Sequence, residues 1–378
     1  MDMRDYFGND QKVRFLFPLD GDCLNRFDGR ESIEGLALEV KVAAEPGLSV
    51  TVNGQPARWN GECYTCTVLL KYYRTTLEAV TSNGDSVSIA VYKLYDAVGK
   101  YRLSSDDNIL FLQDLNDHPE YRSLFDNPYL AVYKKSHDLY GACVHLNVYY
   151  EYGEEEMEEF ADHKKPFDLS MMTDRYKEEW KANAHWLRLS FHARKNYPNA
   201  PYKNASAQEV SADIEKVHRE IIRFAGEEVL SPVTTLHFGA ANLQVTRALR
   251  EHGYRCLTGY FEVRENGDPL VAYHYPAEFV RHVGGRDFWK DNQEDILFGR
   301  IDRVLNYPQD PVENIAALEE VAKNPHRAGF ISIMIHEEYF YPDYGNARPR
   351  FEELVLEACR WCHEHGYRGA LLSDTVFE

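Results

Sequence analysis

The hydrophobic pattern of this chain changes abruptly at about residue 99. Before that point, short runs alternate apolar and polar residues, separated by turn signals such as Asn53-Gly54 and Asn83-Gly84. Alternation with a period of two is typical of half-buried strands, and the spacing of the turns is typical of a β-sandwich. The pattern predicts a short tail over residues 1–10 and a small all-β sandwich domain over residues 11–97.

Beyond Gly99, strand-like runs alternate with helical patterns, as in βα units around a parallel sheet. The chain over residues 98–378 is therefore predicted to be α/β, a distorted (β/α) barrel of roughly seven or eight strands. The predicted strands are YRLSS or just beyond it, CVHLNVYY, WLRLSFHA, TTLHFG, RCLTGY, ILFGRIDRVL, FISIMIHEE and GALLSD. The clearest helical patterns are PYLAVYKKSHDLYGA, AQEVSADIEKVHREIIRFAGEE, NLQVTRALREHGY, PVENIAALEEVAKN and RFEELVLEACRWCHEHGY.

The charge of the chain limits its partners. With 42 Lys and Arg against 61 Asp and Glu, the net charge is -19, which opposes phosphate backbones and anionic lipid surfaces. We expect no nucleic acid partner and no membrane association, since no apolar stretch is long enough to span a bilayer. The first residues show no secretory signal, so a cytoplasmic location is expected. The acidic run at residues 151–165 predicts a solvated loop or a helix start, and the sequence sets no oligomeric state.

The seven cysteines are an odd number scattered through a long chain, which favours reduced thiols. Two Cys-x-x-Cys pairs, Cys63 with Cys66 and Cys359 with Cys362, raise the question of a zinc site. The first pair lies in an alternating, strand-like run, where residues three apart face opposite sides. The second pair lies in a helical pattern and fits core packing. We therefore expect neither pair to bind metal.

Polar residues at the predicted strand ends are the candidates for chemistry, because the catalytic residues of a βα barrel project from the carboxyl ends of its strands. They are Asp106, Asp107, His192, His237, His336 and Glu337. Carboxylates and imidazoles together can hold a divalent ion, which activates water and polarises an acyl oxygen. A second aspartate could take the water's proton, and a histidine could protonate the departing group. The set predicts a hydrolytic metal site.

These residues resemble the polysaccharide deacetylases, carbohydrate esterase family 4 in the broad sense. The matching segments are SSDDN, CVHLNVYY, LSFHA, LHFGAAN and IMIHEE, within residues 100–378. The resemblance implies a distorted barrel, an acylated carbohydrate as substrate and one divalent metal, which could be Zn, Ni, Co or Mn. It also implies that Asp106 is the general base, that Asp107 and His192 are metal ligands and that His336 is the general acid.

The chain departs from the family pattern at its metal strand. The family has a second histidine four residues after the first, where this chain has Asn196. His237 is a candidate for the missing ligand. The arginine of the family's Arg-Pro-Pro-Tyr-Gly loop is absent too, so the centre is predicted to be either rearranged or inactive. The segment before residue 98 is similar to the immunoglobulin-like modules that precede catalytic domains in carbohydrate-active enzymes, which implies an accessory role.

Two other functions fit the same residues. A glycoside hydrolase would pair Asp106 or Asp107 with Glu337, with carboxyl groups roughly 5 to 9.5 Å apart. A catalytically lost barrel would instead bind carbohydrate on aromatic surfaces. The expected substrate-binding residues are Glu337, Tyr202, Trp289 and Tyr339.

Overall fold

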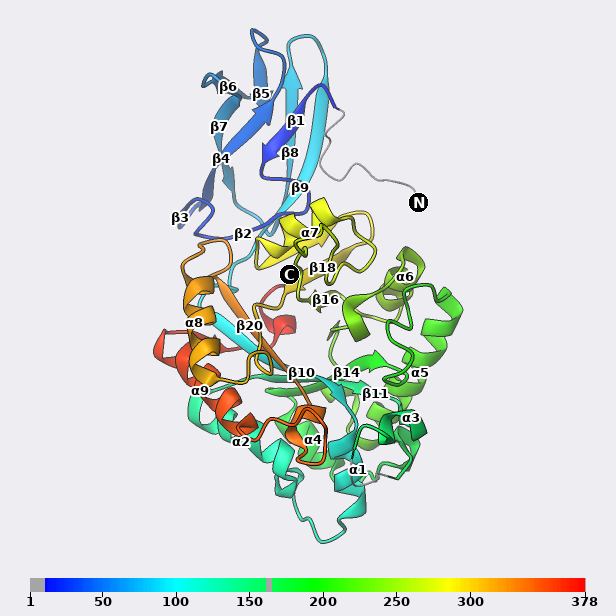
Figure 1. The fold of residues 1–378 in the computed structure, drawn as a ribbon. Coiled ribbons are helices and arrows are strands. Elements are labelled where there is room, and N and C mark those ends of the chain that lie inside the picture. Colours follow the sequence, from blue (N-terminus) through cyan, green and yellow to red (C-terminus); the bar gives the residue numbers. More distant parts are fainter. Residues whose placement is uncertain (1–10, 161–164, 378) are drawn as a thin grey trace.

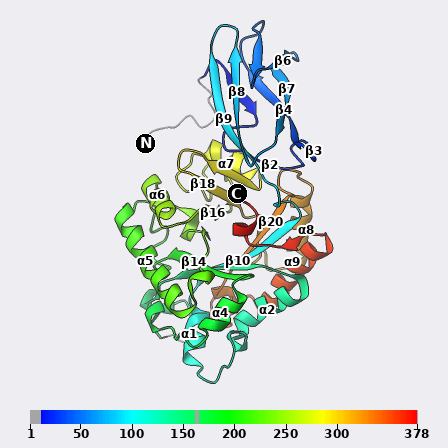
Figure 2. The same ribbon diagram turned by 180° about the vertical axis from the view of Figure 1, so that it is seen from behind.

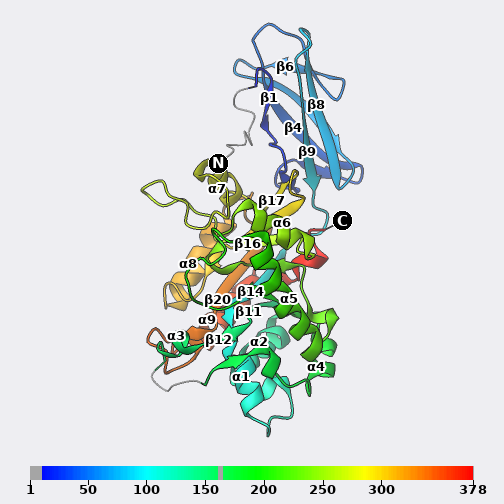
Figure 3. The same ribbon diagram turned by 90° about the vertical axis from the view of Figure 1, so that its right-hand side faces the viewer.

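The computed structural model describes residues 11–160 and 165–377, in two parts that follow the change of pattern. Residues 14–93 form β-strands with no helix among them, and the remaining described chain is mixed α/β. Figure 1 shows β1 to β9 standing at one end of the α/β part, next to α7 (Ala277–Gly284), and Figure 3 shows the same stacking from the side. The predicted tail at residues 1–10 lies outside the described residues, and the exact domain limits stay predictions.

The first part is a set of β-ribbons closed over an apolar core. All its strand pairs are antiparallel except β2 with β9, which are parallel. Leu36, Leu38, Val40 and Val42 are fully buried on one face of β4, as the alternation predicts. Its strands are β1 (Arg14–Phe17), β2 (Cys23–Leu24), β3 (Arg30–Ser32), β4 (Gly35–Ala43), β5 (Val50–Val52), β6 (Gln55–Trp59), β7 (Tyr64–Leu70), β8 (Arg74–Thr81) and β9 (Ser86–Lys93). The immunoglobulin-like connectivity stays a prediction.

A curled parallel sheet forms the centre of the α/β part. Its strand order is β14-β11-β10-β20-β19, with β21 on β10. A second sheet of order β15-β16-β18-β17 is parallel except for β17, and a bridge between Leu189 and Leu230 ties it to the first. The strands are β10 (Lys100–Asn108), β11 (Val144–Tyr149), β14 (Leu187–Ala193), β15 (Val233–Thr234), β16 (Cys256–Gly259), β17 (Phe288–Asp291), β18 (Ile296–Arg300), β19 (Arg303–Val304), β20 (Phe330–His336) and β21 (Arg368–Gly369). A mixed α/β fold is confirmed, and the number of barrel strands stays a prediction.

Helices surround this curled sheet. Figure 2 shows them around β10 and β14, and α5 packs on β14 while α9 packs on β20. The helices are α1 (Leu110–Asp117), α2 (Pro128–Tyr140), α3 (Glu154–Met157), α4 (Lys177–Asn183), α5 (Ala207–Phe224), α6 (Leu243–Glu251), α7, α8 (Pro311–Ala322) and α9 (Phe351–Glu364). The predicted α2, α5, α6, α8 and α9 are confirmed. Helices α1, α4 and α7 were not predicted. They are short, and the side chain of the N-cap residue makes no capping hydrogen bond in any of the three.

Smaller elements complete the α/β part. The acidic run contains β12 (Glu151–Tyr152), which pairs with β13 (Phe167–Asp168), and α3. Its Glu156 is buried and accepts a hydrogen bond from the backbone of Gly153, so this part of the run is not fully solvated; residues 161–164 lie outside the described residues. Single 3-10 turns lie at Leu124–Asp126, Leu169–Met171, Glu227–Val229, His237–Gly239, Glu338–Phe340 and Leu372–Asp374.

Two expectations about the whole chain can be compared with the structure. All seven cysteines are free, and Cys359 and Cys362 are buried on α9 as predicted. Among the helices of the described residues, none combines the length and apolar character needed to cross a membrane.

Candidate metal centre

Asp106 and Asp107 end β10 rather than lying in a turn after it. Asp106 pairs with His336 across the sheet, and the register between β10 and β11 shifts between Ser105 and Asn108. Neighbouring residues of a regular strand face opposite sides. Asp107 has a φ of 63°, in the left-handed region, and irregular backbone of this kind re-aims side chains. Both carboxylates consequently line the same cleft.

Three predicted ligands converge at this cleft. Within residues 11–160 and 165–377, the group suited to a metal ion is Asp107, His192 and His237, whose ligand atoms lie within 4.8 Å of one another. Asp107 Oδ1 is 3.0 Å from His192 Nε2 and 3.4 Å from His237 Nδ1. The two imidazole nitrogens are 3.1 Å apart. Because β14 supplies His192 and the turn after β15 supplies His237, the convergence depends on the curled sheet.

Backbone carbonyls determine which imidazole nitrogens face Asp107. His192 Nδ1 donates to the carbonyl of Thr235, and His237 Nε2 donates to the carbonyl of Asn196 at 2.9 Å. A carbonyl only accepts, so these nitrogens carry the ring protons. In the neutral rings, lone pairs on His192 Nε2 and His237 Nδ1 then point at each other and at a carboxylate. Three facing electron-pair donors with fixed outer partners fit a divalent cation.

The charges of the site agree with this. Burial opposes ionisation of Asp107, but its contacts with His192 and His237 hold the pKa of that carboxyl well below the ordinary 3.8. Burial by itself would lower the pKa of His192, yet Asp106 and Asp107 raise it above 6.5. The site is thus a negative, water-poor position that favours a cation.

Tyr149 belongs to the centre and was missed by the sequence analysis. Its hydroxyl donates to Asp107 Oδ1 and lies 3.0 Å from His237 Nδ1 and 3.2 Å from Asn196 Oδ1. Burial, with the charge of Asp107, raises the pKa of Tyr149 well above 10, so the phenol is neutral. Its place at the carboxyl end of β11 was the available signal, because polar side chains at strand ends gather at one edge.

The predicted base and acid flank the triad. Asp106 is buried, and its Oδ1 accepts a hydrogen bond of 2.6 Å from Asn147 Nδ2. Burial raises the pKa of Asp106 above 3.8, against the lowering effect of His192 and His336. His336 Nδ1 is 2.9 Å from Asn306 Oδ1, which leaves Nε2 as its second nitrogen. Both residues line the cleft, whose volume is about 310 Å³.

The expected substrate contact Glu337 does not reach the cleft. It is fully buried, and its carboxylate accepts hydrogen bonds from the backbone N–H groups of Ile109, Leu110 and Phe111, at 2.6, 3.0 and 2.5 Å. These are the unpaired donors at the start of α1. The glycoside hydrolase hypothesis that pairs Glu337 with Asp106 or Asp107 is therefore wrong. Its neighbour Glu338, which was not predicted, lines the cleft instead.

The three predicted aromatic contacts also lie outside the cleft lining. Trp289 is buried where β17 meets the first part, and its Nε1 donates to the carbonyl of Asp20 at 2.8 Å. The Tyr202 hydroxyl is buried against Asp213, and the Tyr339 hydroxyl contacts Tyr307. Core packing and hydrogen bonding account for all three. The aromatic residues that line the cleft are Tyr197, Phe238, Tyr260 and Tyr344.

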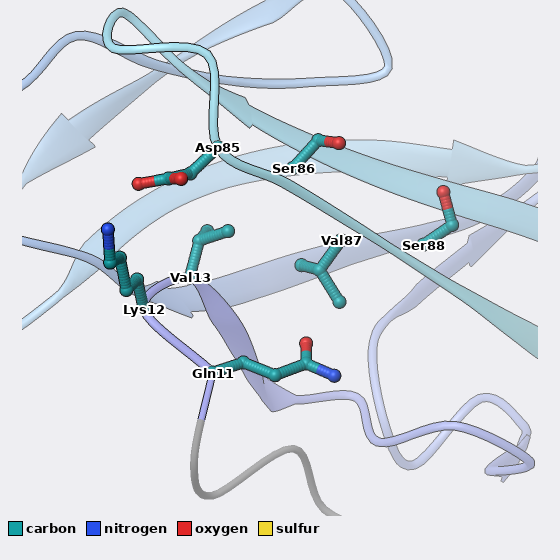
Figure 4. Close-up of a pocket in the computed structure, with 7 residues that line it drawn as sticks. All are labelled: Gln11, Lys12, Val13, Asp85, Ser86, Val87 and Ser88. Carbon is teal, nitrogen blue, oxygen red and sulfur yellow. The ribbon is translucent and has the colours of Figure 1, made fainter.

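A second hollow, of about 450 Å³, lies at the edge of the first part. Figure 4 shows its lining, from Gln11 to Val13 and from Asp85 to Ser88. Most of these side chains are exposed, and no histidine or cysteine is among them. The chemistry of the described residues therefore points to the cleft at Asp107.

No family model matches the sequence, and a search of the curated proteins finds no match. Several solved structures are similar. A Mycobacterium smegmatis protein assigned as a polysaccharide deacetylase has a TM-score of 0.43 and 10% identity over 74% of this chain and 89% of its own. A family 4 acetyl xylan esterase from Clostridium thermocellum, in complex with a cobalt ion, has a TM-score of 0.36 and 12% identity over 72% and 88%. A 4-alpha-glucanotransferase from Thermococcus litoralis has a TM-score of 0.45 and 10% identity over 72% and 39%.

Proposed function

We propose that this protein is a metal-dependent hydrolase that removes an acetyl or other acyl group from a carbohydrate. One observation carries the proposal: lone pairs of His192 Nε2 and His237 Nδ1 face the Asp107 carboxylate beside a second buried carboxylate, Asp106. Asp107, His192 and His237 would hold the metal, and two imidazoles with one carboxylate suit Zn, Ni, Co or Mn. We further propose that residues 11–97 serve as an accessory domain and that the protein acts in the cytoplasm.

A bound divalent ion would supply a Lewis acid for the acyl oxygen and lower the pKa of a water molecule. Asp106, held by Asn147, takes the proton of the attacking water. His336, held by Asn306, gives a proton to the departing oxygen or nitrogen of the sugar. The neutral Tyr149 hydroxyl keeps Asp107 and His237 in place. In this assignment Asn196 replaces the family's second histidine as an orienting residue, since its carbonyl fixes His237.

The experiment is a metal and activity assay on the full chain. We expect about one Zn or Co ion per chain and hydrolysis of 4-nitrophenyl acetate and acetylated xylo-oligosaccharides. A chelator should abolish hydrolysis, and added Co or Zn should restore it. The matched variant Asp106→Asn should keep the metal and lose about 10²- to 10⁴-fold in rate. Metal binding without hydrolysis would favour a catalytically lost barrel, and absence of metal binding would overturn the proposal.

A further inference from the structure

Phe238 is an exposed aromatic residue beside the candidate metal centre. Its side chain is 52% exposed, and it lines the cleft directly after His237. Its φ of 60° and ψ of 2° are left-handed, a conformation that a bulky residue rarely adopts and that carries strain. Burial in a core does not explain a ring that is half exposed. A strained backbone that presents an apolar ring to a cleft calls for a functional explanation.

Neighbouring residues hold the backbone directly after Phe238. The next residue, Gly239, also has a positive φ of 54°, and a Cβ there would lie 2.3 Å from Val271 Cγ1. The Gly239 carbonyl accepts a hydrogen bond of 2.7 Å from the backbone N–H of Tyr273. The Tyr273 hydroxyl donates in turn to the carbonyl of Thr258, at 2.8 Å. The segment around Val271 and Tyr273 thus holds the backbone of the turn that carries Phe238.

The position of the ring relates it to the triad. Its centroid is 4.6 Å from that of His237, with an interplanar angle of 81°. The edge-to-face contact uses part of the Phe238 ring surface, and the exposed remainder faces solvent in the cleft. A flat apolar ring next to the reacting group can accept the apolar face of a pyranose.

The charge of the cleft restricts what the ring can accept. Of the described residues that line the cleft, none is Lys or Arg, and four are the carboxylates Asp106, Asp107, Glu159 and Glu338. Anionic groups such as phosphates and uronates would therefore meet acidic side chains and no Lys or Arg.

We propose that Phe238 is a substrate-binding residue: its ring stacks against the sugar next to the acyl-bearing residue, and it selects oligosaccharides that carry no anionic group. That an acyl-bearing sugar lies beside the ring rests on the proposed function. Stacking needs neither metal nor turnover, so the stacking proposal and the proposed function can fail separately. Phe238 then sets affinity for the glycan.

The test is calorimetric binding to chelator-treated protein, with N-acetylchitopentaose and acetylated xylopentaose as probes. We expect at least one to bind the wild type and Phe238→Tyr, and Phe238→Ala to bind it about tenfold more weakly. UDP-N-acetylglucosamine and oligogalacturonate should bind more weakly than that probe. Equal affinity of Phe238→Ala, tighter binding of an anionic probe, or no binding of either neutral probe would overturn the proposal.

Phe238→Gly separates binding from folding. Glycine relieves the left-handed strain, so the midpoint of thermal unfolding should rise while glycan affinity falls as in Phe238→Ala. A purely structural role predicts that affinity would follow stability. In the metal-loaded protein, Phe238→Ala should raise KM for the oligosaccharide and change kcat much less. Glycan binding without any hydrolysis would support the stacking role and overturn the proposed function alone.

Discussion

Two neighbouring strands of the central sheet, β10 and β20, each have a pair of adjacent acidic residues near or just after their carboxyl ends, and the two pairs differ in where their side chains lie. Asp106 and Asp107 at the end of β10 both line the cleft. At the end of β20, Glu338 lines the cleft, while Glu337 points into the protein and caps α1. The pairs are adjacent, because the backbone N–H of Glu337 donates to the carbonyl of Asp106.

The difference has a local backbone cause. At β10, the left-handed φ of Asp107 and the register shift bring both side chains to one side. At β20, the chain enters a 3-10 turn with Glu337 in a helical conformation, so successive side chains diverge. The unpaired N–H groups at the start of α1 then hold the first of them. The direction of each carboxylate thus depends on the nearest group that needs a hydrogen-bond acceptor or a negative charge. Two carboxylates that are adjacent in the sequence can therefore point to different places.

Removal of a ligand at the β10 end should have the largest effect. Asp107→Ala takes away the carboxylate that faces both imidazoles, and the remaining nitrogens would hold a cation without charge compensation. We expect the affinity for Co or Zn to fall by about 100-fold or more, since loss of an outer partner alone typically costs 10- to 100-fold. Titration with a chelating dye as competitor measures this. Asp106→Ala is the matched control and should retain the metal, whereas equal loss in both variants would make Asp106 a ligand.

Glu337→Ala should instead lower stability. It leaves the three backbone N–H groups at the start of α1 without their acceptor in a fully buried place. We expect the free energy of unfolding to fall by roughly 3 kcal/mol, from the desolvation of unpaired donors. Urea denaturation measures the change, and Glu337→Gln, which keeps an acceptor oxygen, should lose less. If Glu337→Ala instead lost hydrolysis at unchanged stability, Glu337 would have a role in the cleft rather than a structural one.

The comparison also shows what the sequence could predict. The polar ends of β10, β14 and β20 could be predicted, because apolar runs that stop at Asp or His mark strand ends that share an edge. His237 could be predicted as a candidate third ligand from its place after a strand, although β15 ends at Thr234. The change of pattern at residue 99 likewise predicted the β-rich and α/β parts.

Other features of the site depend on long-range contacts and could not be predicted. Glu337 contacts α1, which lies more than 220 residues away in the sequence. The local sequence therefore does not distinguish Glu337 from Glu338. Trp289 looked like an exposed aromatic but is buried against Asp20, a contact set by how the two parts pack. Phe238 was not predicted, because its turn packs against Val271 and Tyr273, which are distant in the sequence. Apolar residues at the start of α1 also resembled a strand, since short apolar runs fit both structures.

The pH dependence of stability should separate the wild type from Glu337→Gln. Burial raises the pKa of Glu337 from 4.5 to about 7, against the lowering effect of its hydrogen bonds. The folded state therefore holds its proton more tightly than the unfolded state. This contribution is fully present below pH 4.5 and is lost as the pH rises through about 7. Unfolding measured from pH 5 to 8 should show wild-type stability falling relative to Glu337→Gln. The opposite slope would mean that the hydrogen bonds of Glu337 outweigh burial.

Glu338→Gln should have the smallest effect, although Glu338 lines the cleft. Burial, with the charges of Asp107 and Glu159, raises the pKa of Glu338 well above 4.5, which favours its protonated form. Glutamine is close to that form in shape and charge, and its oxygen can still accept from the Tyr344 hydroxyl, now at 3.1 Å. We expect hydrolysis to change by less than about tenfold, against the 10²- to 10⁴-fold typical of a proton-transfer residue. Tyr344→Phe, which removes the same hydrogen bond from the other side, is the matched control. If Glu338→Gln lost as much hydrolysis as Asp106→Asn, Glu338 would be a proton-transferring carboxylate. The acidic pairs near β10 and β20 would then both contribute to catalysis.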